Sequence, residues 1–282
     1  MRRASGVLLH RKNQPKPDQQ DNRKEFSMFN LQGKKGLVVG IANGQSIAFG
    51  CARAFKLCGA ELAITYINDK AIPHVKPLAD MVAAPIFMRL DVEQPGEMET
   101  LFETIEKTWG KLDFLVHSIA FAPKQDLHGR VTDCSREGFM RAMDISCHSF
   151  IRMAKFAEPL MRDGGCLLTM SYLGADEVIE NYGMMGPVKA ALQASARYLA
   201  AELGPKGIRV HAISPGPLQT RAASGIKEFD KLMDDAVEKA PLHTLVSPDD
   251  VGALAAYLVS DVAKTITGGT IYIDGGYHVL GG

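Results

Sequence analysis

The stretch GLVVGIANGQSIAFGCARAFKLC, residues 36–58, joins a short apolar run to a turn of small residues and then to a segment with helical periodicity. Its glycines stand at Gly40, Gly44 and Gly50, so the spacing differs from G-x-G-x-x-G. Such a turn still lets the backbone approach a pyrophosphate, and a helix beginning after Ser46, which suits the N-cap, offers free N–H groups. The stretch predicts a strand–turn–helix unit, either a dinucleotide-binding turn or an ordinary glycine-rich connection.

The rest of the chain repeats this alternation of short apolar runs and longer helical segments. Runs rich in β-branched residues occupy 36–41, 61–67, 85–90, 112–119, 165–171, 207–213 and 270–274. Segments with helical spacing include 46–58, 96–108, 136–161, 187–203 and 249–259. Strands that are apolar throughout and separated by helices indicate a parallel sheet covered on both faces. The predicted fold class is therefore α/β: a Rossmann-like, doubly wound parallel sheet of about seven strands in a single domain.

Two segments stand apart from this pattern. Residues 1–27 contain seven Lys or Arg and three acidic residues without apolar periodicity, so we expect a basic, disordered extension before a folded domain over 28–282. Residues 214–236 follow the sixth predicted strand with proline and glycine and then become amphipathic. A long connection at the carboxyl edge of a parallel sheet lies where ligands bind, so this segment is predicted to be a mobile substrate lid.

Composition excludes several classes of protein. The chain has 32 basic and 32 acidic residues, which gives no reason to expect a nucleic-acid partner. It has no apolar run of 18 residues, which argues against a membrane span. Its five cysteines are scattered and form no C-x-x-C pair, which favours reduced thiols and a cytoplasmic location. No HExxH or comparable histidine pair is present, so no metal site is predicted.

The ends of the second and third predicted strands bear on the cofactor. The second strand ends in Tyr66-Ile67-Asn68-Asp69-Lys70. No arginine is present there to bind a 2′-phosphate, which favours NADH over NADPH, although Lys70 is a nearby cation. Asp91 follows the third strand, where its carboxylate could accept a hydrogen bond from the adenine amino group or could serve as a helix N-cap.

The stretch SYLGADEVIENYGMMGPVKAAL, residues 171–192, contains two tyrosines and a lysine. A tyrosine and a lysine can form a proton-donating and ribose-holding pair in a nicotinamide-dependent reductase, usually spaced Tyr-x-x-x-Lys. Here Lys189 follows Tyr182 by seven positions, and Tyr172 stands at the end of the fifth strand. Tyr172 is either a second polar group of the cleft or a packing aromatic. Pro187 requires that the helix carrying Lys189 begin close by.

These motifs, in this order, resemble the NADH-dependent enoyl-acyl-carrier-protein reductases of bacterial type II fatty acid synthesis, a family of the short-chain dehydrogenase/reductase superfamily. The similarity covers about residues 29–277. It rests on GIANGQSIAFG (40–50), HSIAFAP (117–123), SYLGA (171–175), Tyr182-x6-Lys189 and PGPLQTRAASGI (215–226). The resemblance implies reduction of the trans-2,3 double bond of an enoyl thioester, a homotetramer, and an acyl carrier protein as the partner that delivers the substrate.

The same resemblance implies roles for individual residues. The cofactor-binding residues would be Gly40, Ser46 and Ile47 at the pyrophosphate turn, Asp91 and Val92 beside adenine, Ser118, Ile119 and Ala120 under the nicotinamide ribose, Lys189 on the ribose hydroxyls, and Leu218 and Thr220 at the base of the lid. Ile67 stands where the family often has a glutamine, and its side chain cannot form a hydrogen bond with adenosine. The substrate-binding residues would be Ala122, Tyr172, Tyr182 and Met185.

The catalytic residues would be Tyr182 and Lys189, with Tyr172 as a further candidate. When hydride adds to the β-carbon of the enoyl thioester, negative charge develops on the thioester oxygen, and a neutral phenol can donate a hydrogen bond to it. The alternatives are an ordinary carbonyl or alcohol reductase, which would need the Tyr-x-x-x-Lys spacing, and a non-catalytic nucleotide sensor. The sequence leaves open whether the α-carbon takes its proton from Tyr182 or from solvent.

Overall fold

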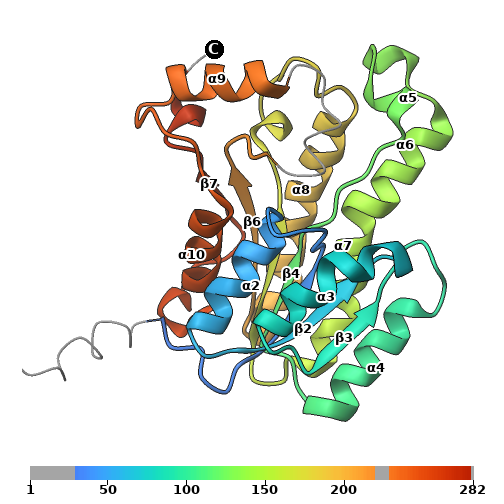
Figure 1. Cartoon of the computed structure of the whole chain (residues 1–282), viewed down its shortest axis with the longest axis vertical. Helices are drawn as coiled ribbons and strands as arrows, with labels where there is room; N and C mark the ends of the chain where they lie inside the picture. The colour runs from blue at the N-terminus through green and yellow to red at the C-terminus, as the bar shows by residue number, and fades with distance from the viewer. Residues whose placement is uncertain (1–28, 220–228, 281–282) are drawn as a thin grey trace, which may run out of the picture.

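The computed structural model describes residues 29–219 and 229–280, which contain one seven-stranded parallel sheet in the order β3-β2-β1-β4-β5-β6-β7. This confirms the predicted doubly wound α/β fold (Figure 1). The strand order reverses between β1 and β4, and such a switch point opens a crevice at the carboxyl ends of the strands. The strands are β1 (Lys35–Val39), β2 (Glu61–Tyr66), β3 (Ile86–Arg89), β4 (Phe114–His117), β5 (Gly165–Met170), β6 (Ile208–Pro215) and β7 (Thr270–Ile273).

Helices cover both faces of this sheet because alternate strand residues point to opposite sides. Val38 packs with α2, α3 and α10, whereas Leu37 and Val39 pack with α4, α7 and α8. Both faces are therefore apolar, as a buried parallel sheet requires. The helices are α2 (Ile47–Leu57), α3 (Ile72–Met81), α4 (Glu97–Trp109), α5 (Lys124–Leu127), α6 (Arg136–Met143), α7 (Ser149–Ala157), α8 (Met185–Leu203), α9 (Phe229–Lys239) and α10 (Pro248–Val259).

The helices of the structure differ from the sequence-based prediction in two places. The segment 136–161, predicted as one helix, is divided into α6, a π-helical segment over Asp144–His148, α7 and a short 3-10 turn. Within the π-helical segment, the Ser146 hydroxyl accepts from the N–H of Phe121 at 2.9 Å and donates to its carbonyl oxygen at 3.1 Å. Helix α3 was not predicted, because its two prolines at positions 73 and 77 obscure a pattern that rests on Val75 and Ala79.

The carboxyl edge of the sheet carries additional structure above it. Helix α9 and the pair α5 and α6 rise over this edge on opposite sides (Figure 1). Helix α9 includes the end of the segment 214–236, and residues 220–228 of that segment lie outside the described residues. The basic extension predicted for residues 1–27 also lies outside them.

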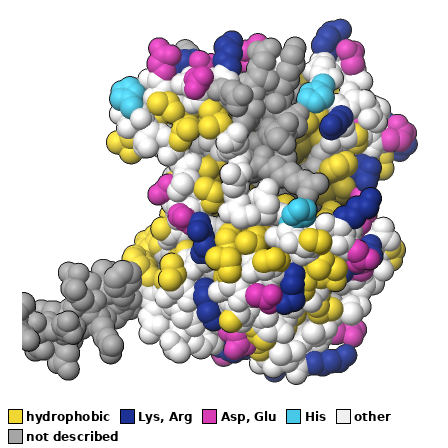
Figure 2. All heavy atoms as spheres, viewed as in Figure 1, with side chains coloured by type: hydrophobic (Ala, Val, Ile, Leu, Met, Phe, Trp, Pro, Cys, Tyr) yellow, Lys and Arg dark blue, Asp and Glu magenta, His cyan; other side chains and the backbone are white. Residues whose placement is uncertain are grey.

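The surface of the described chain is mixed in character. Hydrophobic, basic and acidic side chains are interspersed on the face shown in Figure 2. Across the described residues, helices long and apolar enough to cross a membrane are absent. The five cysteines are free thiols.

Helix α2 is fixed against α10 by two glycines. A methyl group added at Gly50 would lie 2.0 Å from the carbonyl oxygen of Pro248, and one added at Gly252 would lie 2.4 Å from the carbonyl oxygen of Gly50. Since real carbon atoms do not approach an oxygen this closely, the two helix backbones are in direct contact. This contact fixes the direction in which α2 leaves the turn at the end of β1.

We therefore expect Gly50→Ala to lower the free energy of unfolding by about 1–3 kcal/mol, the usual effect of overpacking. The control is Gly269→Ala, because a methyl group at Gly269 meets nothing within 4 Å. Chemical denaturation of both variants measures the difference. Equal stability of Gly50→Ala and the wild type would contradict the direct helix–helix contact.

Candidate active site

Gly40 brings the ends of two central strands together at the switch point. It follows β1 with a φ of +107°, and a methyl group there would lie 2.0 Å from the carbonyl oxygen of Ser118. The backbone N–H of Ser118 donates to the carbonyl oxygen of Val39 at 3.0 Å. Only glycine fits this left-handed and crowded position. The structure thus places two of the predicted cofactor residues, Gly40 and Ser118, in contact.

The turn before α2 is shaped by Ser46. Its hydroxyl accepts from the backbone N–H groups of Ala42 and Asn43, each at 3.0 Å. Ser46 occupies the N-cap position as predicted, but its side chain holds the turn and does not cap the helix. Among the hydrogen bonds of the described residues, none uses the N–H groups of Ile47 or Ala48. These donors and the positive end of the helix dipole fit a pyrophosphate.

The adenosine end of the predicted site lies beyond β2 and β3. The Ile67 side chain is 55% exposed, and Val92 is buried. Asp91 accepts a hydrogen bond from the N–H of Glu93 at 3.1 Å. The N-cap role for Asp91 is wrong, because α4 begins six residues later and has Gly96 as its N-cap. The structure therefore leaves the Asp91 carboxylate at the sheet edge, stabilising a turn.

A buried histidine supports the segment 118–120, in which Ser118 and Ile119 are half-buried and Ala120 is exposed. The Ser149 hydroxyl donates to the carbonyl oxygen of Ile145 at 2.7 Å, so it accepts from Nε2–H of His117 at 2.7 Å. Nδ1 of His117 then accepts from the Thr169 hydroxyl at 2.9 Å. Burial, with the nearby Lys189 charge, lowers the pKa of His117 to about 3. His117 is thus a neutral core residue.

The four predicted substrate-binding residues share one apolar cluster. Tyr182 and Met185 are buried in it, and Ala122 and Tyr172 pack against it. The rings of Tyr172 and Tyr182 meet edge to face, with centroids 4.9 Å apart. Met184 is buried in the same cluster. The structure therefore brings the two tyrosines together, although ten residues separate them.

The backbone around Tyr182 is unusual. Asn181 and Gly183 both have left-handed conformations, with φ values of +61° and +51°. Such residues occur in turns and at functional sites, where the surrounding structure maintains them. The Tyr182 ring packs on Gly174, where a methyl group would lie only 2.4 Å from it. The orientation of Tyr182 is thus set by the backbone on both sides of it and by the turn beneath it.

Lys189 is buried and points to the end of β5. Its Nζ donates a hydrogen bond to the carbonyl oxygen of Met170 at 2.7 Å. Burial lowers the pKa of Lys189 to about 8, so the side chain is mostly cationic at pH 7. Helix α8 begins at Met185, which puts Pro187 in the first turn, where it is tolerated as predicted.

Both tyrosines remain protonated over the ordinary pH range. Burial raises the pKa of Tyr182, and the neighbouring Tyr172 adds to this effect. Burial also raises the pKa of Tyr172. The Tyr172 hydroxyl is buried without a hydrogen-bond partner among the described residues. An unpaired buried hydroxyl is unfavourable, so this group fits a ligand or a water that accepts from it or donates to it.

Of the two residues predicted at the base of the lid, the structure describes one. Leu218 is buried and packs with the cluster that contains α2 and α10. Thr220 lies outside the described residues.

In the part of the chain that the structure describes, groups of three or more His, Cys, Asp or Glu that could hold a metal ion are absent.

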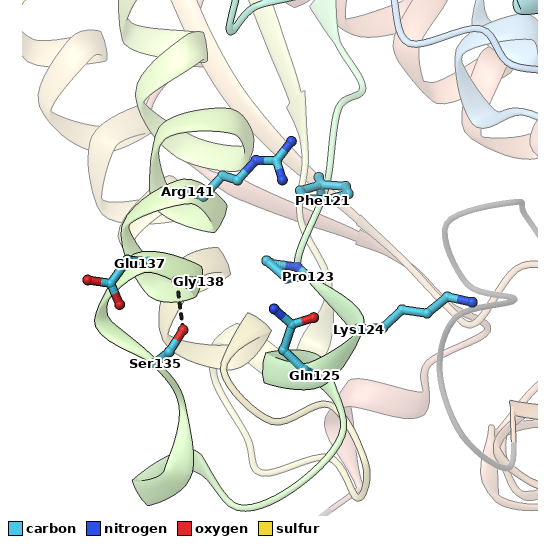
Figure 3. A pocket seen from close by; sticks show the side chains of 8 residues that line it. All are labelled: Phe121, Pro123, Lys124, Gln125, Ser135, Glu137, Gly138 and Arg141. Atoms are coloured by element: carbon cyan, nitrogen blue, oxygen red, sulfur yellow. Dashed lines mark hydrogen bonds between the residues drawn. The ribbon is translucent and has the colours of Figure 1, made fainter.

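A pocket of about 500 Å³ opens between the loop after β4 and α6 (Figure 3). It is lined by Phe121, Pro123, Lys124, Gln125, Ser135, Glu137, Gly138 and Arg141. None of these is a predicted site residue. Arg141 is already paired with Glu93 through two 2.8 Å hydrogen bonds and lies over the Phe121 ring. We place the chemistry at the sheet edge, where the unpaired hydroxyl, the free N–H groups and the cation lie.

Sequence reasoning missed two groups of this site. The Met170 carbonyl oxygen that accepts from Lys189 is a backbone atom, so no residue type signals it. Ser146 fixes the backbone at Phe121 from the π-helical segment, and a serine within a helical pattern gives no such indication. Three features of the site together fit a dinucleotide: the free N–H groups at the start of α2, the close backbone contact at Gly40, and the Lys189 ammonium.

Comparison with known proteins agrees with this geometry. The family profile described as enoyl-(acyl carrier protein) reductase matches residues 40–278. The enoyl-acyl-carrier-protein reductase (NADH) 1 of Rhizobium meliloti is 45% identical over 251 residues, covering 89% of this chain and 92% of the relative. The reductase of Anaplasma phagocytophilum, crystallised in complex with NAD, is 44% identical with a TM-score of 0.86 and covers 90% of this chain and 97% of its own.

A third relative was crystallised with the other nicotinamide cofactor. The Bacillus cereus enoyl-acyl-carrier-protein reductase, in complex with NADP+ and indole naphthyridinone, is 42% identical with a TM-score of 0.87 and covers 89% of this chain and 98% of its own. Relatives of this identity and coverage, together with the profile match, show that the chain belongs to the enoyl-acyl-carrier-protein reductase family.

Proposed function

We propose that this protein reduces the trans-2,3 double bond of enoyl-acyl-carrier-protein thioesters with NADH, as the last step of the fatty acid elongation cycle. The observation that carries the proposal is the Tyr172–Tyr182 pair, 4.9 Å between ring centroids, in one apolar cluster with Ala122 and Met185. Lys189, seven residues after Tyr182, provides the cation. An apolar cluster that contains two phenol groups suits a fatty acyl thioester better than a small polar ketone.

The hydroxyl of Tyr182 would donate a hydrogen bond to the thioester oxygen. NADH, when bound, supplies the hydride that adds to the β-carbon of the substrate. Negative charge then develops on the thioester oxygen, and a donor already aimed at this atom stabilises the transition state. The raised pKa of Tyr182 keeps the donor protonated.

The α-carbon must also receive a proton. We assign Tyr172 as the second polar group of the cleft, because its buried hydroxyl has no partner among the described residues. From there it could hold the substrate or a relaying water. The immediate donor to the α-carbon is then Tyr182 itself or a solvent molecule.

The cofactor would lie across the switch point of the sheet. In this assignment Gly40, Ser46 and Ile47 hold the pyrophosphate, and Lys189 holds the nicotinamide ribose beside Ser118, Ile119 and Ala120. Asp91, Val92 and Ile67 surround the adenosine, and Leu218 and Thr220 lie at the base of the lid. We propose NADH over NADPH, because no arginine stands at the end of β2 and the apolar Ile67 side chain is exposed there.

The partner and the assembly are part of the same proposal. We infer that an acyl carrier protein delivers the thioester, that residues 214–236 close over it as a lid, and that the enzyme is a homotetramer. Large exposed apolar side chains support an oligomer: Tyr198 on α8 is 79% exposed and Met140 on α6 is 56% exposed. The free cysteines support a reducing compartment, and we propose the cytoplasm.

The reaction is tested by following the absorbance of NADH and of NADPH with a crotonyl thioester of acyl carrier protein, and with a ketone substrate in parallel. We expect oxidation of NADH with the enoyl thioester and little with NADPH or with the ketone. Turnover of the ketone without turnover of the enoyl thioester would contradict the proposal.

We expect Tyr182→Phe to lower kcat about 10²–10³-fold, the usual effect of removing one donor to a developing oxyanion. Binding of NADH, measured by its fluorescence, should change little, because phenylalanine preserves the packing on Gly174. Val178→Ala is a matched control from the same segment, since the Val178 side chain is fully exposed. An unchanged kcat in Tyr182→Phe would remove this residue from the mechanism.

The charge of Lys189 should appear in the pH dependence of cofactor binding. The folded-state pKa of about 8 lies below the ordinary value of 10.5, so the cation is lost as the pH rises through about 8. Because NADH is anionic, its affinity should fall across this range. Fluorescence titration between about pH 6.5 and pH 9.5 measures the change. In Lys189→Met, affinity should be weak and independent of pH, and a wild-type profile in that variant would contradict the role.

A further inference from the structure

Two side chains on α8 hold the end of β5 immediately before Tyr172. Lys189 and Gln193 stand four residues apart on one face of the helix, and each is 4% exposed. Lys189 donates to the carbonyl oxygen of Met170, and the Gln193 amide donates to the hydroxyl of Ser171 at 2.9 Å. The helix that carries the cation is thus bonded to the two residues that precede the first tyrosine.

The same amide reaches into the segment that joins the two tyrosines. Its second N–H donates to Oδ2 of Asp176 at 3.0 Å. The hydroxyl of Tyr272, on the edge strand β7, donates to the same oxygen at 2.8 Å. Asp176 follows a short 3-10 turn over Leu173–Ala175. One carboxylate oxygen therefore ties the tyrosine-bearing segment to both α8 and β7.

Tyr272 is itself held in place by the chain that follows β7. Its ring stacks on His278, with centroids 4.0 Å apart and an interplanar angle of 9°. Nδ1 of His278 lies 2.9 Å from the Asp274 carboxylate. That carboxylate also accepts from the backbone N–H groups of Gly276 and His278. These contacts therefore orient the Tyr272 ring, and with it the hydroxyl that donates to Asp176.

The turn over Leu173–Ala175 is in direct contact with Tyr182. The Tyr182 ring packs on Gly174, within the turn that Asp176 closes, so a shift of the turn moves the ring. The backbone N–H of Asp176 also donates to the carbonyl oxygen of Leu173 at 2.9 Å. A displacement of about 1 Å at a reacting group can lower a rate about 100-fold, so the rate would be sensitive to a shift of this turn.

We propose that Gln193, Asp176 and Tyr272 are positioning residues that hold Tyr172 and Tyr182 in register with Lys189. The hydrogen-bonded triad acts on the catalytic step and not on cofactor affinity, because its side-chain hydrogen bonds reach Ser171 and Asp176, and neither of these residues is assigned to the cofactor. This inference rests on the proposed function, since it assigns the triad to the enoyl reduction carried out by the two tyrosines.

The test compares Asp176→Leu with Asp176→Asn. The amide oxygen of asparagine can still accept from both Gln193 and Tyr272, whereas leucine can accept from neither. We expect Asp176→Leu to lower kcat about 10–100-fold while the dissociation constant for NADH changes less than about 2-fold. Asp176→Asn should stay within about 3-fold of the wild type in both quantities. Glu177→Leu, at the next exposed carboxylate, is the control and should behave as wild type.

A second pair of variants covers the case in which Asp176→Leu does not fold. Tyr272→Phe removes one oxygen atom, and Gln193→Met keeps the volume of the side chain. On its own, each should lower kcat while leaving the dissociation constant for NADH unchanged. Where Asp176→Leu does fold, each should have little further effect in that background, as members of one network do. Equal losses in Asp176→Asn and Asp176→Leu, a parallel loss of NADH affinity, or an unchanged kcat in Tyr272→Phe would each overturn the proposal.

Hydrogen exchange separates this proposal from the function on which it rests. Absence of enoyl turnover in the wild type would contradict the proposed function alone. Exchange of the backbone amides of residues 172–182 should still accelerate in Asp176→Leu and not in Asp176→Asn, with no change in β1 or α2. Unchanged exchange in Asp176→Leu would show that the triad does not hold the segment and would overturn the inference.

Discussion

The hydrogen bond from Nζ of Lys189 to the carbonyl oxygen of Met170, 2.7 Å long, fixes the relation between the cation and the tyrosines. It joins α8 to the last residue of β5, and the chain continues from there to Tyr172. Burial of the amine lowers its pKa to about 8, so at neutral pH the ammonium form is only modestly favoured over the neutral amine. A favourable interaction with an anionic dinucleotide would then stabilise the ammonium form of Lys189.

Three titratable side chains described near this bond are kept uncharged by burial. His117, beside the site, has both ring nitrogens occupied by hydroxyl groups and a pKa lowered to about 3, so it adds no second positive charge. Had it been protonated, it would have repelled Lys189 in a medium of low dielectric constant. The two tyrosines are likewise kept neutral by burial. Among the described residues, Lys189 is thus a buried cation beside neutral hydrogen-bonding groups, which suits a reaction that develops negative charge.

Much of this arrangement could be predicted from the sequence, and the remainder could not for identifiable reasons. The strands of the sheet are apolar throughout, so their number and parallel direction could be predicted from the pattern. The late position of Lys189 relative to Tyr182 indicated the chemistry. The π-helical segment at Ser146 was not predictable, because one extra residue in a helical turn leaves the periodicity almost unchanged. Asp91 was assigned to an N-cap among other roles because the length of the loop before α4 was unknown.

We propose above all that hydride is delivered to a carbon–carbon double bond and not to a carbonyl group. The most direct measurement uses NADH deuterated at the reactive face of C4, a crotonyl thioester of acyl carrier protein, and NMR analysis of the product. We expect one deuterium at the β-carbon of a butyryl thioester. Deuterium at the carbonyl carbon, or a product that keeps the double bond, would contradict it.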